Sequence, residues 1–191
     1  MVFWPSTTLN GLVSCPKCQL TTLLGGFDKL PKDKLPAIRK VLKAHEQKST
    51  AGKDQSADLA QRLKIAESVY RQLDKDKSFW CFFQRMAGYL LDKDGKPKEA
   101  ALARRKALAN AEAMEKEGPA NAKKEPLYIQ GAMLAYLGDK EKALSRLKAA
   151  AATPVTPGGP IKAEQAENMN RFINSLAQEL IQKLESGQKL P

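Results

Sequence analysis

The chain has few of the residues from which chemical sites are built. It contains three cysteines and one histidine among 191 residues, and aromatic residues make up only 6% of it. An odd number of cysteines does not complete a disulfide framework, so we expect a reducing compartment, the cytoplasm. Ser-His-Asp groupings, glycine-rich phosphate loops and paired-carboxylate motifs are also missing. Catalysis therefore has no candidate residues, and we expect a protein that is not an enzyme.

Long hydrophobic runs are absent as well, whereas positive charge is in excess. No run of about 18 apolar residues occurs, so no segment is predicted to span a membrane. The first residues lack the basic n-region of a secretory signal, which again favours the cytoplasm. The 32 Lys and Arg residues outnumber the 21 Asp and Glu residues and give a formal net charge of +11. This charge favours partners that carry negative charge.

The spacing of apolar residues after Gly25-Gly26 is helical almost throughout, and no segment shows sustained alternation. It predicts an all-α fold of about six or seven helices that follow a short irregular N-terminal segment. The first two helices are predicted from the stripes Leu35-Ile38-Leu42-His45 and Leu59-Leu63-Ala66-Val69-Leu73, the second with Ser56 as its N-cap. Further helices are predicted over 79–91, 97–117, 126–137 and 140–151, and a C-terminal amphipathic helix carries the stripe from Ala166 to Leu184.

Small residues form an internal repeat. The first copy consists of Gly88, Gly95, Ala100 and Ala107, and the second of Gly131, Gly138, Ala143 and Ala150, with an offset of 43 residues. Small residues are needed where the two helices of a hairpin cross closely, because a larger side chain would hold the backbones apart. The repeat therefore predicts two helical hairpins that turn at Gly95 and Gly138.

The second copy, PLYIQGAMLAYLGDKEKALSRLKAA, resembles a tetratricopeptide repeat (TPR), a helix-turn-helix unit. The first copy departs from the pattern, because Arg104 stands where Leu147 does and the offset exceeds the usual length of about 34 residues. The resemblance implies TPR-like antiparallel hairpins that bind a peptide or a partner helix on a concave face. The expected contact residues are Phe82, Arg85, Tyr89, Tyr128 and Tyr136, since aromatic residues and arginine dominate binding hot spots. The alternative is that these residues pack against neighbouring helices.

A second function class is a nucleic-acid-associated basic protein, with or without a zinc knuckle. Residues 29–53 hold eight basic and two acidic side chains, and Arg104-Arg105-Lys106 form another basic run. Such runs can bind phosphates, although no aromatic residues are interleaved to stack on bases.

Cys15 and Cys18 form a Cys-x-x-Cys pair, which is half of a structural zinc site. His45 and Cys81 are the remaining His and Cys residues, and each falls on an apolar helical stripe where burial is the commoner role. We therefore expect no cofactor and well under one zinc per chain in a monomer. Zinc is an option at Cys15 and Cys18 only if a homodimer or unrecognised ligands complete the site. A redox role is disfavoured because no βαβ pattern surrounds the pair.

Three segments together, CPKCQLTTLLGGFDKLPKDKLPAIRKVL, FWCFFQRMAGYLL and LYIQGAMLAYLGDKEKALSRL, resemble an uncharacterised bacterial family, a domain of unknown function. The family joins a Cys-Pro-x-Cys zinc-knuckle module to TPR-like helices. Its first knuckle has no counterpart here, and Gln19-Leu20 replace the Gly-Tyr that follows its second knuckle. The resemblance implies a degenerate knuckle segment over 1–30, a TPR-like domain over 31–155 and a C-terminal helix over 160–186 that packs on that domain.

Overall fold

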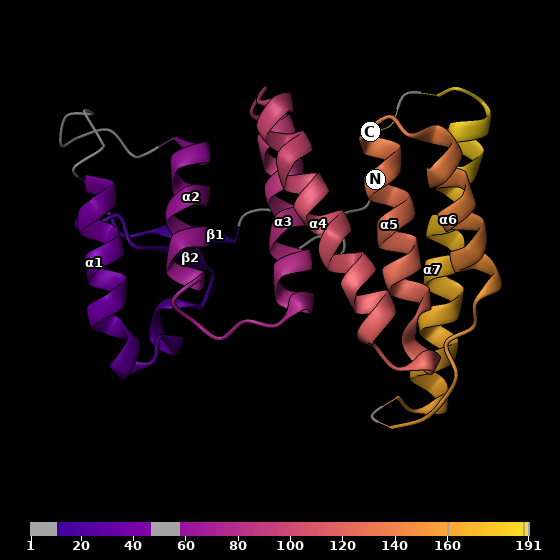
Figure 1. Cartoon of the computed structure of the whole chain (residues 1–191), viewed down its shortest axis with the longest axis horizontal. Helices are drawn as coiled ribbons and strands as arrows, with labels where there is room; N and C mark the ends of the chain where they lie inside the picture. Colours follow the sequence, from indigo (N-terminus) through magenta and orange to yellow (C-terminus); the bar gives the residue numbers. More distant parts are fainter. Residues whose placement is uncertain (1–10, 47–57, 160, 189, 191) are drawn as a thin grey trace. The chain divides into compact units, whose positions relative to one another are not determined.

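The computed structural model describes residues 11–46, 58–159, 161–188 and 190, which fall into two compact units. The hairpin unit comprises residues 11–46, 58–76 and 89–97, and the helical unit comprises the other described residues. Across these ranges the chain forms seven α-helices and one two-stranded sheet, which confirms the predicted all-α fold (Figure 1). The predicted division into three segments is a sequence-based expectation that this grouping does not test.

The hairpin unit begins with two short strands, β1 (Leu12–Ser14) and β2 (Thr21–Leu23), which pair antiparallel with Leu12 opposite Leu23. Two 3-10 turns, Phe27–Lys29 and Lys32–Lys34, lead to α1 (Leu35–Glu46) and α2 (Leu59–Tyr70). Both strands contact α2, and α1 packs on α2 (Figure 1). The core contains Ile38 and Leu42 from the first predicted stripe, Val69 from the second, and Ile65, which neither stripe includes; Leu20, Leu30 and Leu73 pack against them.

The start of α2 differs in detail from the prediction. The N-cap is Asp58, whose Oδ1 accepts a hydrogen bond of 2.7 Å from the backbone N–H of Gln61. Asp58 also forms an ion pair of 3.0 Å with Lys96. Ser56, the predicted cap, lies outside the described residues.

The helical unit contains most of α3 (Lys77–Lys93), which passes into the hairpin unit at Tyr89, and most of α4 (Pro97–Glu117), whose bounds match the prediction. It continues through a 3-10 turn (Ala120–Ala122) to α5 (Lys124–Tyr136), α6 (Lys140–Ala152) and α7 (Ala163–Glu185). Helix α7 packs against both α5 and α6. No helix in the described ranges is long and apolar enough to cross a membrane. The core is lined mainly by Cys81, Ala107, Ala111, Leu127, Tyr128, Ile129, Ala132, Met133, Leu147, Ile173, Ala177 and Leu180.

The repeated small residues have the same structural roles in both copies. Ala100, Ala107, Ala143 and Ala150 are each 0% exposed. Gly95 and Gly138 adopt left-handed φ values of +71° and +86°, which side chains disfavour. Each glycine is followed by the same turn bond: the N–H of Lys96 donates to Leu91 O at 2.8 Å, and the N–H of Asp139 donates to Leu134 O at 3.0 Å. These bonds cap α3 and α5 in the manner of a Schellman motif. The repeat is thus a repeat of structure as well as of sequence.

The first glycine of each copy lies where two helices touch. A Cβ at Gly131 would lie 2.6 Å from Leu147 Cγ and 3.0 Å from the backbone N of Leu147. A Cβ at Gly88 would lie 3.0 Å from Arg104 Cγ. Since Gly88 and Arg104 occupy the same repeat positions as Gly131 and Leu147, both hairpins cross at a glycine. The glycines therefore set the distance between the paired helices.

A buried lysine joins the two ends of the second hairpin. Lys124, the first residue of α5, is only 1% exposed. Its ammonium donates hydrogen bonds to the carbonyl oxygens of Ala150, Ala151 and Thr153, at 2.8, 3.4 and 2.8 Å. These are carbonyls at the C-terminal end of α6, which carries the negative end of the helix dipole. The interaction provides partners for backbone groups that would otherwise be left without them.

We predict that Gly131→Ala lowers the free energy of unfolding by about 1–3 kcal/mol, because the new methyl group overpacks the contact with Leu147. In the Leu147→Ala background the same change should destabilise less, because the contacts with Leu147 Cγ and Cδ2 are gone while the contact with its backbone N remains. Urea denaturation of the four proteins measures both effects. A stabilising effect of Gly131→Ala in the wild-type background would mean that α5 and α6 do not cross at this residue.

Candidate functional site

The Cys pair lies in the connection between β1 and β2, which we call the knuckle loop (residues 15–20). The N–H of Cys15 donates to Leu20 O at 2.8 Å, and the N–H of Gln19 donates to Cys15 O at 2.9 Å. Pro16 follows Cys15 and supplies the fixed φ that favours a turn. The sequence predicted no strands here, because strands of three residues are too short to show alternation. A β-hairpin therefore holds the two thiols on one compact loop.

Gln19 has a left-handed backbone, with a φ of +57°, and no other non-glycine residue in the described ranges has a positive φ. Glycine adopts this conformation without steric cost, whereas a side chain at this position costs about 1–2 kcal/mol. The Gln19 side chain hydrogen-bonds to Pro16 O at 3.2 Å, which offsets part of that cost. The loop thus keeps a turn suited to glycine although glutamine occupies the position.

Side chains of α2 hold the β-hairpin in place. Arg62 donates one hydrogen bond to Ser14 Oγ at 3.0 Å and another to the carbonyl oxygen of Leu12. The N–H of Leu23 donates to the hydroxyl of Tyr70 at 2.7 Å. Ser14 and Thr21 share a hydroxyl hydrogen bond of 2.9 Å between the two strands. Both strands are consequently tied to one helix.

The two thiols interact with each other and differ in acidity. Backbone N–H groups of Cys18 and Lys17 donate toward the Cys15 sulfur and lower the pKa of that thiol, with smaller contributions from the Cys18 thiol and the Lys17 charge. Burial raises the pKa of Cys18, against an opposing hydrogen bond from the Leu20 backbone. Cys15 is therefore the first of the pair to form a thiolate as pH rises.

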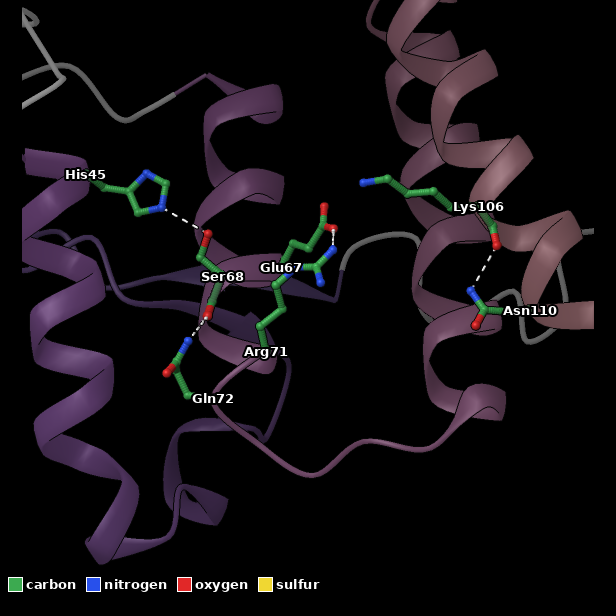
Figure 2. A network of polar contacts seen from close by, with 7 residues as sticks. All are labelled: His45, Glu67, Ser68, Arg71, Gln72, Lys106 and Asn110. Carbon is green, nitrogen blue, oxygen red and sulfur yellow. Dashed lines mark hydrogen bonds and ion pairs between the residues drawn. The ribbon is translucent and has the colours of Figure 1, made fainter. Parts of the chain in front are cut away.

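His45 and Cys81 do not complete a metal site in the described structure. The Nε2 atom of His45 lies 3.1 Å from Ser68 Oγ on α2, as Figure 2 shows, and Gln61 approaches its Nδ1 at 3.5 Å. Cys81 is buried in the core of the helical unit, where its thiol donates to Ala107 O at 3.6 Å. Burial raises the pKa of Cys81 to about 11. Within the described ranges, no three His, Cys, Asp or Glu residues gather in a group that could hold a metal ion.

The five predicted contact residues differ in accessibility. Arg85 and Tyr128 are 8% and 6% exposed, and burial raises the pKa of the Tyr128 hydroxyl. Phe82 and Tyr136 are half-buried on α3 and α5. Tyr89, also half-buried, lies on the last turn of α3 beneath the ammonium of Lys93, which is 4.9 Å from the ring centroid. Only Phe82, Tyr89 and Tyr136 thus offer appreciable side-chain surface.

Arg104 is a residue whose role the sequence did not indicate. Its aliphatic stem packs where Leu147 packs in the second hairpin, and its guanidinium carbon lies 4.7 Å from the centroid of the Tyr136 ring. Arg104 is 8% exposed, so it contributes little to the basic surface predicted around Arg105 and Lys106. The neighbouring Lys106 accepts, through its backbone oxygen, a hydrogen bond from Asn110 (Figure 2). The sequence pattern did not indicate a buried packing role for Arg104, because arginine is not counted among the apolar residues that mark a core-facing stripe.

No family model, curated protein or solved structure matches the chain in any of three comparisons. The resemblances to TPR repeats and to the bacterial zinc-knuckle family therefore remain predictions from the sequence.

We predict that iodoacetamide modifies Cys15 faster than Cys18 in the native protein near neutral pH, and Cys81 most slowly. A lowered pKa gives Cys15 the larger thiolate fraction, and the thiolate is the reactive form. Mass spectrometry of peptides after timed quenching gives the three rates, and the same reaction in urea should give similar rates for all three. Native rates that are equal at Cys15 and Cys18 would contradict the hydrogen bonds assigned to the Cys15 sulfur.

Proposed function

We propose that the helical unit is a non-enzymatic interaction module that binds an acidic peptide or a partner helix. The observation that carries this proposal is the duplicated hairpin, with glycine crossings at Gly88 and Gly131 and four matched alanines that are fully buried. Stacked helical hairpins form surfaces from the first helix of each pair, and proteins with such repeats use these surfaces to hold other chains. The proposed likeness to TPR modules rests on the same feature.

The side chains proposed to contact the partner are those of the predicted set that are accessible. Phe82 on α3 and Tyr136 on α5 come from the first helices of the two hairpins and keep part of their surface accessible. Aromatic side chains provide large contact areas at low entropic cost. Arg85 and Tyr128 support this surface from within the core. The net charge of +11 favours a partner rich in Asp and Glu.

Selection of phage-displayed random peptides on the immobilised full chain tests the proposal. We expect enriched peptides to combine acidic with apolar residues. Their affinity should fall about tenfold or more in the Phe82→Ala, Tyr136→Ala double variant, since hot-spot aromatics contribute at least about 1–2 kcal/mol. Fluorescence anisotropy with labelled synthetic peptides measures the change, and circular dichroism checks that the variant is folded.

Leu102→Ala is the matched control. Leu102 is apolar and 54% exposed in the same unit, but it lies on α4, the second helix of its hairpin. Its substitution should leave peptide affinity unchanged. The proposal fails if no peptide is enriched, or if the enriched peptides bind the double variant as tightly as the wild type.

A second candidate is binding of nucleic acid through α1. Arg39, Lys40 and Lys43 are all exposed on this helix, and they form no ion pair with the side chains that the structure describes. Exposed cations on one helix can contact consecutive phosphates. The exposed cations of α1 place the candidate nucleic-acid surface on the hairpin unit, whereas peptide binding is proposed for the helical unit. The two candidate functions can therefore be tested separately.

If α1 contacts three phosphates, the affinity for a duplex oligonucleotide should fall about 40-fold when salt rises fourfold, from a slope of about −0.9 per contact. Replacement of Arg39, Lys40 and Lys43 by alanine should remove most of that salt dependence. Anisotropy titrations of a labelled duplex at several salt concentrations provide the slopes. An affinity that the triple variant retains at all salt concentrations would eliminate α1 as the nucleic-acid surface.

A further inference from the structure

The knuckle loop supplies two metal ligands, which is too few for a closed zinc site. Zinc in structural sites is tetrahedral and takes four protein ligands. Cys15 and Cys18 lie on one tight turn, closed by the bonds from Cys15 N–H to Leu20 O and from Gln19 N–H to Cys15 O, but no third His, Cys, Asp or Glu of the described ranges joins them in a group. A zinc ion held here by one chain would need water or other ligands for half of its coordination sphere. The residues present therefore do not fit structural zinc.

Two thiolates do satisfy a different class of ion. Monovalent copper is a soft d¹⁰ cation that prefers thiolate ligands. It is stable with two sulfur ligands in a nearly linear arrangement, because it has no demand for a tetrahedral shell. Two partly exposed thiols on one turn, with no His, Cys, Asp or Glu of the described residues grouped with them, match that preference in both ligand type and number.

The surroundings of the loop suit the charge of such a complex. Cu⁺ bound by two thiolates carries a net charge of −1, and binding releases two protons to solvent. The backbone N–H groups of Cys18 and Lys17 lower the pKa of the Cys15 thiol and so favour its thiolate form. The exposed ammonium of Lys17 adds positive charge between the two ligands. Donors and a cation thus surround the atoms on which the negative charge would lie.

Hydrogen bonds also hold the chain on both sides of the two cysteines. Ser14 and Thr21 share a hydroxyl hydrogen bond, Arg62 ties Ser14 to α2, and Thr21 Oγ1 donates to Gln19 O at 2.9 Å. Thr21 is fully buried. Backbone held in this way lowers the entropic cost of bringing two ligands to one ion.

We propose that the knuckle loop is a two-coordinate Cu(I) site whose ligands are the thiolates of Cys15 and Cys18. One chain is sufficient to bind one ion. The Lys17 ammonium and the backbone N–H groups stabilise the anionic complex, and neither His45 nor Cys81 takes part.

The test is an anaerobic titration of the reduced full chain with the coloured Cu(I)–bicinchoninate complex. We expect the chain to remove one Cu(I) per monomer from this probe, and X-ray absorption of the product to show two sulfur neighbours. Cys15→Ser and Cys18→Ser should each weaken binding about 100-fold or more, as loss of one of two ligands leaves the ion without a stable shell. Cys81→Ser should bind as the wild type does. Circular dichroism shows whether each variant is folded.

Lys17→Glu gives a readout that does not remove a ligand. It should weaken Cu(I) binding about threefold to tenfold through loss of the local positive charge, and Lys29→Glu, which lies outside the loop, should change it less. The proposal is overturned if the chain takes no copper from the probe, or if Cys15→Ser still does. It is also overturned if an equimolar amount of zinc displaces Cu(I), whether zinc binds once per chain or once per two chains.

Discussion

The close approach of α5 to α6 at Gly131 is the constraint on which the helical unit depends. Leu147 occupies the space that a side chain at Gly131 would need, so the Leu147 side chain of α6 packs against the backbone of α5. At this separation Ala143 and Ala150 of α6 are fully buried, and α7 packs against both helices. The same separation brings the ammonium of Lys124 to the last carbonyls of α6. A wider crossing would leave that charge buried without partners, which is costly.

The first hairpin reaches the same geometry with different chemistry. Arg104 replaces Leu147 opposite the crossing glycine, and its methylene groups fill the equivalent space. The guanidinium then needs a partner inside the protein, and the face of the Tyr136 ring on the next hairpin receives it. A packing position in one hairpin thereby becomes a link to its neighbour. The departure of the first copy from the repeat pattern is compensated by a contact that a leucine could not make.

In the hairpin unit, too, an unexpected residue occupies a structural position. In the loop around Cys15 and Cys18, glutamine takes a left-handed position that glycine adopts more readily. Hydrogen bonds with Arg62 and Tyr70 of α2 anchor the strands on either side of the loop. The two cysteines, between these strands, are partly exposed.

The sequence by itself determined where the helices lie and that they form two related hairpins. Helix α4 begins at Pro97 and ends before Gly118 as the sequence indicated, because helix limits and apolar periodicity are properties of neighbouring residues. The small residues of the repeat likewise kept their spacing. Only the tertiary structure decided that Arg85 and Tyr128 are buried, that Arg104 packs in place of a leucine, and that Lys124 caps α6. The tertiary structure also decided that the two strands form, because α2 holds them in place. In each case the deciding partner is distant along the chain, as Ala150 is from Lys124 and Leu12 is from Arg62. Local pattern carries no information on such pairs, since burial and hydrogen bonding depend on which segments the folded chain brings together.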